Sequence, residues 1–157
     1  MRSGLRSGGS MNPIEVKILL VEDDDVDAES VVRGLARADI HNPLVRARDG
    51  VDAMDTLLGT NGKQRLEPPY LLLIDITMPR LDGLGLIRKI RSNRKLKRTI
   101  IFVLTTSDSE RDCAAAYDAH VAGYILKSSS PEHYAALSRM LDYFLSIVSP
   151  PPVEHSE

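Results

Sequence analysis

Short apolar runs alternate along the chain with longer segments in which apolar residues recur every three or four positions. Turn residues bound these runs, and their length is that of strands rather than of helices. Their apolar residues are continuous, which is typical of parallel strands covered on both faces. We expect strands at residues 16–21, 44–48, 70–74, 99–105 and 122–126.

The segments between the runs have the periodicity of amphipathic helices. In the first segment Asp24 or Asp25 can serve as the N-cap. The residues expected on its buried face are Ala28, Val31, Val32 and Leu35. Further helices are expected at residues 50–58, 83–90, 109–117 and 131–148.

Strand and helix alternate five times along the chain. This order predicts an α/β fold, a five-stranded parallel sheet with helices on both faces and right-handed crossovers. Residues 1–12 are expected to be a flexible leader, with Met11 as a natural start, and residues 150–157 a flexible tail. One domain over residues 13–149 remains, without room for a separate DNA-binding module.

Composition removes several classes of protein. A formal net charge of −2 and the absence of Trp argue against nucleic-acid binding. The apolar runs are shorter than the roughly 18 residues of a membrane span. The single Cys113 excludes an internal disulfide framework, so we expect a cytoplasmic protein with no membrane contact.

Polar residues follow the expected strands at the carboxyl ends of four of them. Ligands of open α/β sheets bind at this edge. The residues are Glu22, Asp23, Asp75, Thr105 and Lys127. The coincidence predicts one shared site.

The chemistry of these side chains suits phosphoryl transfer. Three carboxylates, Glu22, Asp23 and Asp75, repel one another when close, and a hard divalent cation such as Mg²⁺ removes that repulsion. Lys127 adds a positive charge and Thr105 a hydroxyl donor, so one carboxylate could attack a phosphoryl group in line. The product would be an aspartyl phosphate.

Four stretches together resemble the receiver domains of two-component response regulators. They are LLVEDD at 19–24, LLLIDITMPRLDG at 71–83, VLTTS at 103–107 and GYILK at 123–127. The resemblance extends from Val16 to Val148. It implies a flavodoxin-like (βα)₅ fold with strand order 2-1-3-4-5.

The resemblance also implies a role for each acidic residue. Asp75 would accept a phosphoryl group from a sensor histidine kinase. Asp23, Asp75 and the backbone carbonyl of Thr77 would bind Mg²⁺, and Glu22 would act through a metal-bound water. The protein would then be no enzyme beyond its own Mg²⁺-dependent phosphorylation and dephosphorylation.

A conformational switch is implied as well. Lys127 would pair with the phosphoryl group, Thr105 would move to hydrogen-bond it, and Tyr124 would rotate inward. The face formed by residues 109–117, 122–126 and 131–148 would then report phosphorylation to a partner or to a second copy.

A second apolar stripe on the last expected helix fits such a contact. One stripe has the spacing to face the sheet: Tyr134, Leu137, Leu141, Phe144, Leu145 and Val148. The neighbouring stripe comprises Ala136, Met140, Tyr143 and Ile147. We expect a dimer or partner interface there. The alternative is that helix 109–117 or the tail covers it.

The long loop before the third strand, the VEDDDVDAE opening and the lack of an output domain resemble stand-alone regulators associated with bacterial phytochromes. A bacteriophytochrome kinase is therefore the expected partner, and a carrier within a longer phosphorelay is an alternative.

One residue departs from the family pattern. Receivers usually place a cis-proline after the lysine, and here Ser128 follows Lys127. A pseudo-receiver that binds proteins without accepting phosphate therefore stays open. A haloacid-dehalogenase-type phosphatase would need an acid at Thr77, and a dinucleotide enzyme would need a glycine-rich loop where VEDDD stands.

Overall fold

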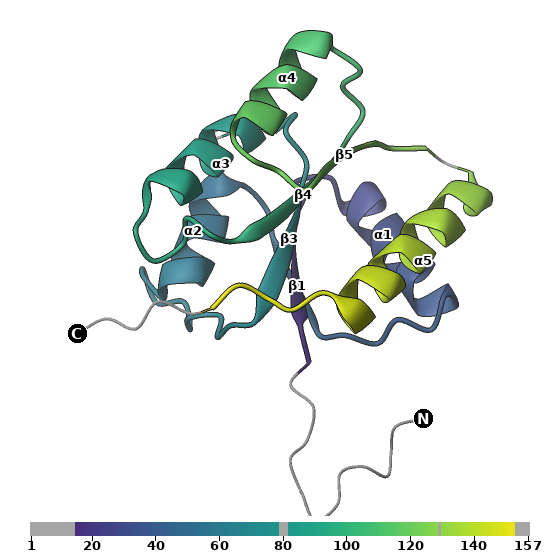
Figure 1. Cartoon of the computed structure of the whole chain (residues 1–157), viewed down its shortest axis with the longest axis horizontal. Coiled ribbons are helices and arrows are strands. Elements are labelled where there is room, and N and C mark those ends of the chain that lie inside the picture. The colour runs from purple at the N-terminus through teal and green to yellow at the C-terminus, as the bar shows by residue number, and fades with distance from the viewer. Residues whose placement is uncertain (1–14, 79–81, 129, 153–157) are drawn as a thin grey trace, which may run out of the picture.

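The computed structural model describes residues 15–78, 82–128 and 130–152. The expected leader at residues 1–12 and residues 153–157 of the expected tail lie outside this range. Within it, five parallel strands form one sheet in the order β2-β1-β3-β4-β5 (Figure 1). The predicted α/β fold and its flavodoxin-like strand order are confirmed.

The ten elements follow one another as expected from the sequence. Their bounds are β1 Lys17–Val21, α1 Asp25–Arg37, β2 Leu44–Ala47, α2 Gly50–Leu58, β3 Tyr70–Ile74, α3 Gly83–Ser92, β4 Ile100–Thr105, α4 Glu110–Asp118, β5 Gly123–Leu126 and α5 Pro131–Ile147. Most bounds lie within one or two residues of the predicted ones, which is the ordinary uncertainty of helix and strand ends.

Helices cover both faces of the sheet (Figure 1). On one face α1 and α5 pack against each other and against alternate strand residues such as Ile18 and Leu71. On the other face α2, α3 and α4 cover the intervening residues, such as Leu19 and Leu72. This alternation follows from the opposite orientation of successive side chains in a strand.

β2 forms one edge of the sheet, and its first three residues are only half-buried.

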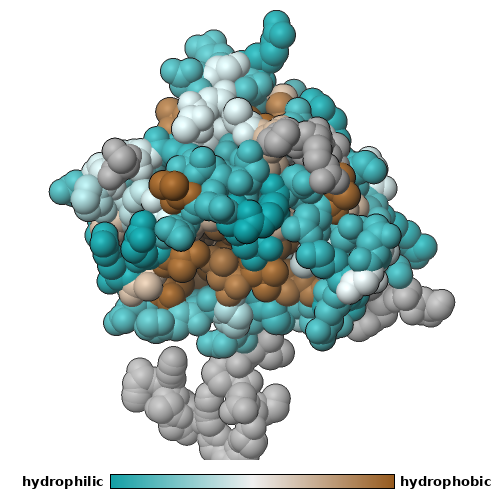
Figure 2. Space-filling model, turned by 180° about the vertical axis from the view of Figure 1, so that it is seen from behind, coloured by the Kyte–Doolittle hydropathy of each residue, from teal (hydrophilic) through white to brown (hydrophobic). Residues whose placement is uncertain are grey.

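Seen from behind, the surface of the molecule is largely hydrophilic around a central apolar area (Figure 2).

Two apolar positions differ from the prediction. Val32 was expected on the buried face of α1 but is 45% exposed. It follows the buried Val31, and about 100° of helix rotation carries it off the stripe. Val148 is exposed because it is the C-cap of α5 and lies beyond its buried stripe.

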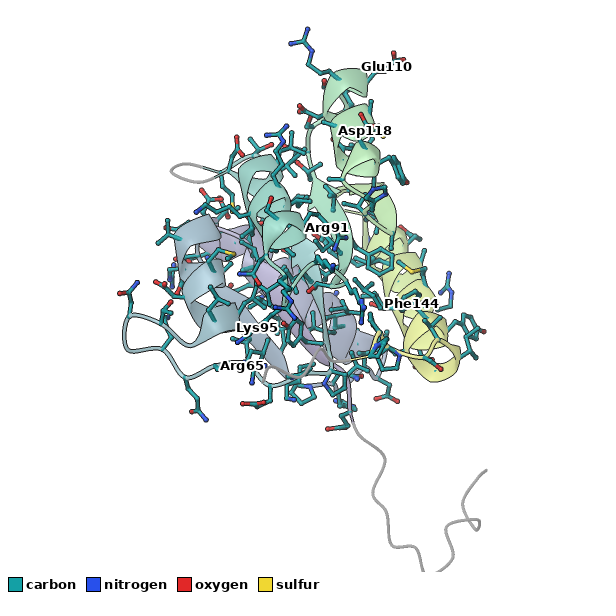
Figure 3. All side chains as sticks on the ribbon, turned by 60° about the vertical axis from the view of Figure 1, so that its left-hand side comes forward. Arg65, Arg91, Lys95, Glu110, Asp118 and Phe144 are labelled. Atoms are coloured by element: carbon teal, nitrogen blue, oxygen red, sulfur yellow. The ribbon has the colours of Figure 1, made fainter. Side chains whose placement is uncertain are left out.

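Arg91 connects its own helix, α3, to the segments that precede β4 and β5 (Figure 3). Its guanidinium donates hydrogen bonds of 2.7–2.9 Å to four backbone carbonyls. The acceptors are Lys97, Thr99, Ala119 and His120. The starts of β4 and β5 are thereby fixed relative to α3.

The opposite end of the sheet from the strand carboxyl ends holds a cleft of about 630 Å³. Its lining includes Arg65, residues 67–70, residues 94–96, Arg98, Thr99 and residues 150–152. Among the described helices, none has the length and apolar character to cross a bilayer.

Candidate functional site

The five residues predicted to share a site lie together at the carboxyl edge of the sheet. Glu22 and Asp23 follow β1, Asp75 follows β3, and Thr105 ends β4. Lys127 follows β5. The strand order places the acidic residues at the centre of the sheet and the lysine at its edge.

The three carboxylates form a compact cluster. One oxygen from each of Glu22, Asp23 and Asp75 lies within 4.8 Å of the others. Glu22 is 1% exposed and Asp75 5% exposed, whereas Asp23 is exposed. A set of oxygen ligands with one side open to water fits a small hard divalent cation.

Backbone groups orient two of the carboxylates. The Thr77 amide donates to Asp75 Oδ1 at 2.9 Å, and the Asp24 amide donates to Glu22 Oε2 at 3.1 Å. A carboxylate oxygen has more than one lone pair, so these bonds leave room for a cation. Gly83 also packs tightly here, because a Cβ at this position would lie 2.5 Å from the Asp75 carbonyl oxygen.

Lys127 lies among acidic side chains. Its Nζ donates to Glu22 Oε1 at 2.6 Å, and to Asp75 Oδ2 at 3.0 Å. Its backbone amide donates to the Thr105 carbonyl at 2.7 Å, which holds the end of β5 beside β4. The side chain is only 7% exposed.

Burial and hydrogen bonding shift the pKa values of this pair. Burial raises the pKa of Glu22 from 4.5 to about 7, although the hydrogen bond from Lys127 acts in the opposite direction. Burial alone would lower the pKa of Lys127, but hydrogen bonds to Asp27, Glu22 and Asp75 outweigh it and raise the pKa. Lys127 is therefore charged throughout the physiological range.

Thr105 is linked to Asp75 through Thr77. It is fully buried, and its hydroxyl is 3.3 Å from the hydroxyl of Thr77, whose amide binds Asp75. The Ser107 amide donates to Thr105 Oγ1 at 3.3 Å. Thr77 itself is exposed.

Tyr124, on β5, contacts the loop that follows β4. Its hydroxyl donates to the Ser107 carbonyl at 2.9 Å, two residues beyond Thr105. The half-buried ring packs against the core on the α2–α4 face. Thr105 and Tyr124, the residues predicted to switch, are thus linked through Ser107.

The expected interface residues lie away from this cluster, on α5. Ala136 is exposed, whereas Met140 is half-buried and packs on the core. Tyr143 and Ile147 are 66% and 80% exposed. Within residues 15–78, 82–128 and 130–152, nothing covers Tyr143 and Ile147, so α4 does not cover them. Residues 153–157 of the tail, the other alternative considered from the sequence, lie outside the described residues.

One of the hydrogen-bond partners of Lys127 was not predicted. Asp27, in the first turn of α1, accepts a hydrogen bond from Lys127 Nζ at 2.8 Å. Helical spacing held a signal, because Asp27 stands four residues before the buried Val31 and so lies on the same face.

The peptide bond after Lys127 is not cis. Among the described residues the cis bond is Pro68–Pro69, at the far end of the sheet. Ser128 thus follows the lysine through an ordinary trans bond, as its cost in a non-proline would favour.

Comparisons with known proteins agree with this geometry. A family model described as a response regulator receiver domain matches residues 18–138. The chain is 39% identical over 117 residues to response regulator Rcp1 of Synechocystis sp., covering 74% of this chain and 79% of Rcp1.

Solved structures show the same likeness. The phosphorylated cyanobacterial phytochrome response regulator RcpA matches with a TM-score of 0.78 and 32% identity, over 88% of this chain and 99% of RcpA. The Mn²⁺-bound form of Rcp1 matches with a TM-score of 0.78 and 33% identity, over 87% of this chain and 99% of that one.

The chain belongs to the response regulator receiver domain family, the signalling proteins of two-component systems. Its similarity to RcpA and Rcp1 confirms the predicted resemblance to phytochrome-associated regulators. The acidic cluster fits the divalent cation that the Rcp1 structure contains.

Proposed function

We propose that this protein is a single-domain response regulator that accepts a phosphoryl group on Asp75 from a sensor histidine kinase. The observation that carries the proposal is the position of Lys127 Nζ, 3.0 Å from a buried Asp75 beside two further carboxylates. A nucleophile, a cation site and a fixed positive charge are thereby combined at one sheet edge.

The residues would divide the reaction as follows. A carboxylate oxygen of Asp75 attacks phosphorus while the phosphorus–nitrogen bond to the kinase histidine breaks, and the imidazole nitrogen leaves with the electron pair. Lys127 neutralises charge on the transferring oxygens, and the Thr77 amide orients Asp75. Glu22, Asp23, Asp75 and the Thr77 carbonyl would hold Mg²⁺. When bound, the cation neutralises phosphoryl charge.

Formation of the acyl phosphate would then change the conformation of the loop after β4. Thr105 would turn from Thr77 towards the phosphoryl oxygens, and Tyr124 would secure the loop through Ser107. This sequence would change the face formed by α4, β5 and α5.

We infer that this face contacts a partner or a second copy of the chain. Each of its three elements carries an exposed large apolar residue: Tyr117 on α4, Leu126 on β5, and Tyr143 and Ile147 on α5. Signalling would thus proceed by protein contact rather than by DNA binding. A homodimer through the α5 stripe is the form we propose.

A bacteriophytochrome kinase is the partner we propose, because the relative RcpA is a phytochrome response regulator. A carrier in a longer phosphorelay would use the same site. The single cysteine fits a reducing compartment, so the proposed site of action is the cytoplasm.

Intact-mass measurement tests the phosphoryl acceptor. The purified chain is incubated with Mg²⁺ and a small phosphoryl donor, beside an Asp75→Asn variant. We expect one phosphoryl adduct on the wild-type chain, lost when the metal is chelated and absent from the variant, because the amide is no nucleophile.

A folded wild-type chain that takes up no phosphoryl group from any donor would contradict this function. That result would favour a pseudo-receiver that binds proteins without phosphorylation. An adduct that persists in Asp75→Asn would instead move the acceptor to another residue.

A further inference from the structure

Asp27 contacts Lys127 from outside the cluster of three carboxylates. We propose that Asp27 is a positioning residue: its carboxylate holds the Lys127 ammonium towards Asp75 and thereby supports phosphoryl transfer. The inference rests on the function proposed above and adds a residue that acts through the lysine.

Each of the three N–H groups of the Lys127 ammonium donates to a carboxylate. Lys127 Nζ lies 2.6 Å from Glu22 Oε1, 2.8 Å from Asp27 Oδ2 and 3.0 Å from Asp75 Oδ2. An ammonium has three donors, so this set is complete. The two bonds to Glu22 and Asp27 therefore restrict where the ammonium lies relative to Asp75.

Asp27 differs from the other two acceptors in its surroundings. Glu22 and Asp75 belong to the group whose oxygens lie within 4.8 Å of one another, and a cation there would compete with the lysine for them. Asp27 comes from the first turn of α1 and is not in that group. A cation held by the three carboxylates would therefore not compete directly for Asp27.

The lysine has room to move if this contact is lost. A cleft of about 560 Å³ between α1 and α5 is lined by Asp27, Lys127, Ser128 and Tyr134, among others. The four-carbon stem of lysine is flexible, and Ser128 lacks the ring that fixes a proline backbone. Asp27, whose side chain is 41% exposed, lines the same cleft, and its hydrogen bond with Lys127 limits how far the ammonium can turn into that space.

Rates of adduct formation test the proposal in the full chain with Mg²⁺ and a small phosphoryl donor. We expect Asp27→Ala to slow phosphorylation about tenfold or more, since small misplacements of a reacting group are costly. Asp27→Asn should slow it less, and Asp27→Glu should restore part of the rate. Glu29→Gln, the same loss of charge on the exposed side of α1, is the matched control and should leave the rate unchanged.

A second measurement separates positioning from a general effect on stability. In a Lys127→Ala background, Asp27→Ala should change the rate no further, because the two residues act as one unit.

The ¹⁵N signal of the Lys127 ammonium should be sharp in the wild-type chain, where three hydrogen bonds hold the group, and broad in Asp27→Asn. Thermal unfolding checks that each variant folds. If Asp27→Ala does not fold, Asp27→Asn takes its place in the rate measurements.

The outcomes are distinguishable from those of the proposed function. If the wild-type chain is phosphorylated and Asp27→Ala and Asp27→Asn keep its rate, or if the effect is the same without Lys127, the positioning role is wrong and the proposed function stands. If the wild-type chain takes up no phosphoryl group, both are wrong.

Discussion

Glu22 carries a carboxylate into an almost fully buried position beside Lys127. Burial disfavours its charged form more than the lysine favours it, so its pKa in the folded chain rises to about 7. In the absence of a cation, Glu22 therefore keeps its proton to a higher pH in the folded chain than in water. A bound cation would reverse that shift, because it supplies the opposite charge that the site lacks.

This shift predicts a pH dependence of stability in the presence of a chelator. The pKa of Glu22 is 4.5 when solvated and about 7 when folded. Its contribution to the free energy of unfolding is complete below pH 4.5 and is lost as the pH rises through about 7. Glu22→Gln cannot titrate, so its stability should fall less steeply across this interval, by up to about 3 kcal/mol.

Urea denaturation between pH 4 and 8 measures the effect, and Glu29→Gln on the exposed side of α1 is its control. Equal slopes for wild type and Glu22→Gln would show that Glu22 ionises normally.

The sequence identifies single residues well where they follow a strand directly. Glu22, Asp23, Asp75, Thr105 and Lys127 could be grouped because parallel strands end at one edge. Asp27 could not, because it lies within α1 and not at the end of a strand. Periodicity shows which face of a helix a residue occupies, but it does not show what that face contacts.

Arg91 illustrates how elements are fixed relative to one another. Its four hydrogen bonds join α3 to the carbonyls before β4 and β5. No run of apolar residues in the sequence indicates this connection, and Figure 3 shows the side chain between α3 and its neighbours.

Arg91→Lys should lower the free energy of unfolding by about 1–3 kcal/mol, because an ammonium cannot reproduce the planar fork and leaves carbonyls unpaired. Urea denaturation measures this loss. Arg88→Lys, on an exposed position of the same helix, should change stability little. Equal stabilities of the two variants would contradict the bridging role.

Element by element, the sequence predicted the architecture closely. Apolar runs marked where the strands begin, and Asp24, one of the two N-caps expected for the first helix, is its N-cap in the structure. The strand order came from the family resemblance, because hydrophobicity does not say which strands are neighbours.

At the scale of the whole molecule, the exposed stripe on α5 is the feature that a monomer explains least. Exposed positions tolerate substitution, so Ile147→Asp together with Tyr143→Ser should leave the fold intact. If the stripe forms a dimer interface, we expect the dissociation constant to rise at least about tenfold, as for central apolar contacts.

Sedimentation before and after phosphorylation measures this constant. Val26→Asp, an equally exposed apolar position on α1, is the control and should leave association unchanged. A wild-type chain that stays monomeric at high concentration in both states would exclude the dimer.

The parallel order of the strands also gives the molecule a reactive pole and an inert pole. The groups assigned to phosphoryl chemistry lie at or beside the carboxyl ends of the strands, whereas residues 59–69 connect α2 to β3 at the other end. Gln64 in that connection is exposed. A fluorophore or an immobilisation linker placed there would leave the phosphoryl-transfer site and the face formed by α4, β5 and α5 free. Phosphorylation and partner binding could then be followed on a labelled or immobilised protein.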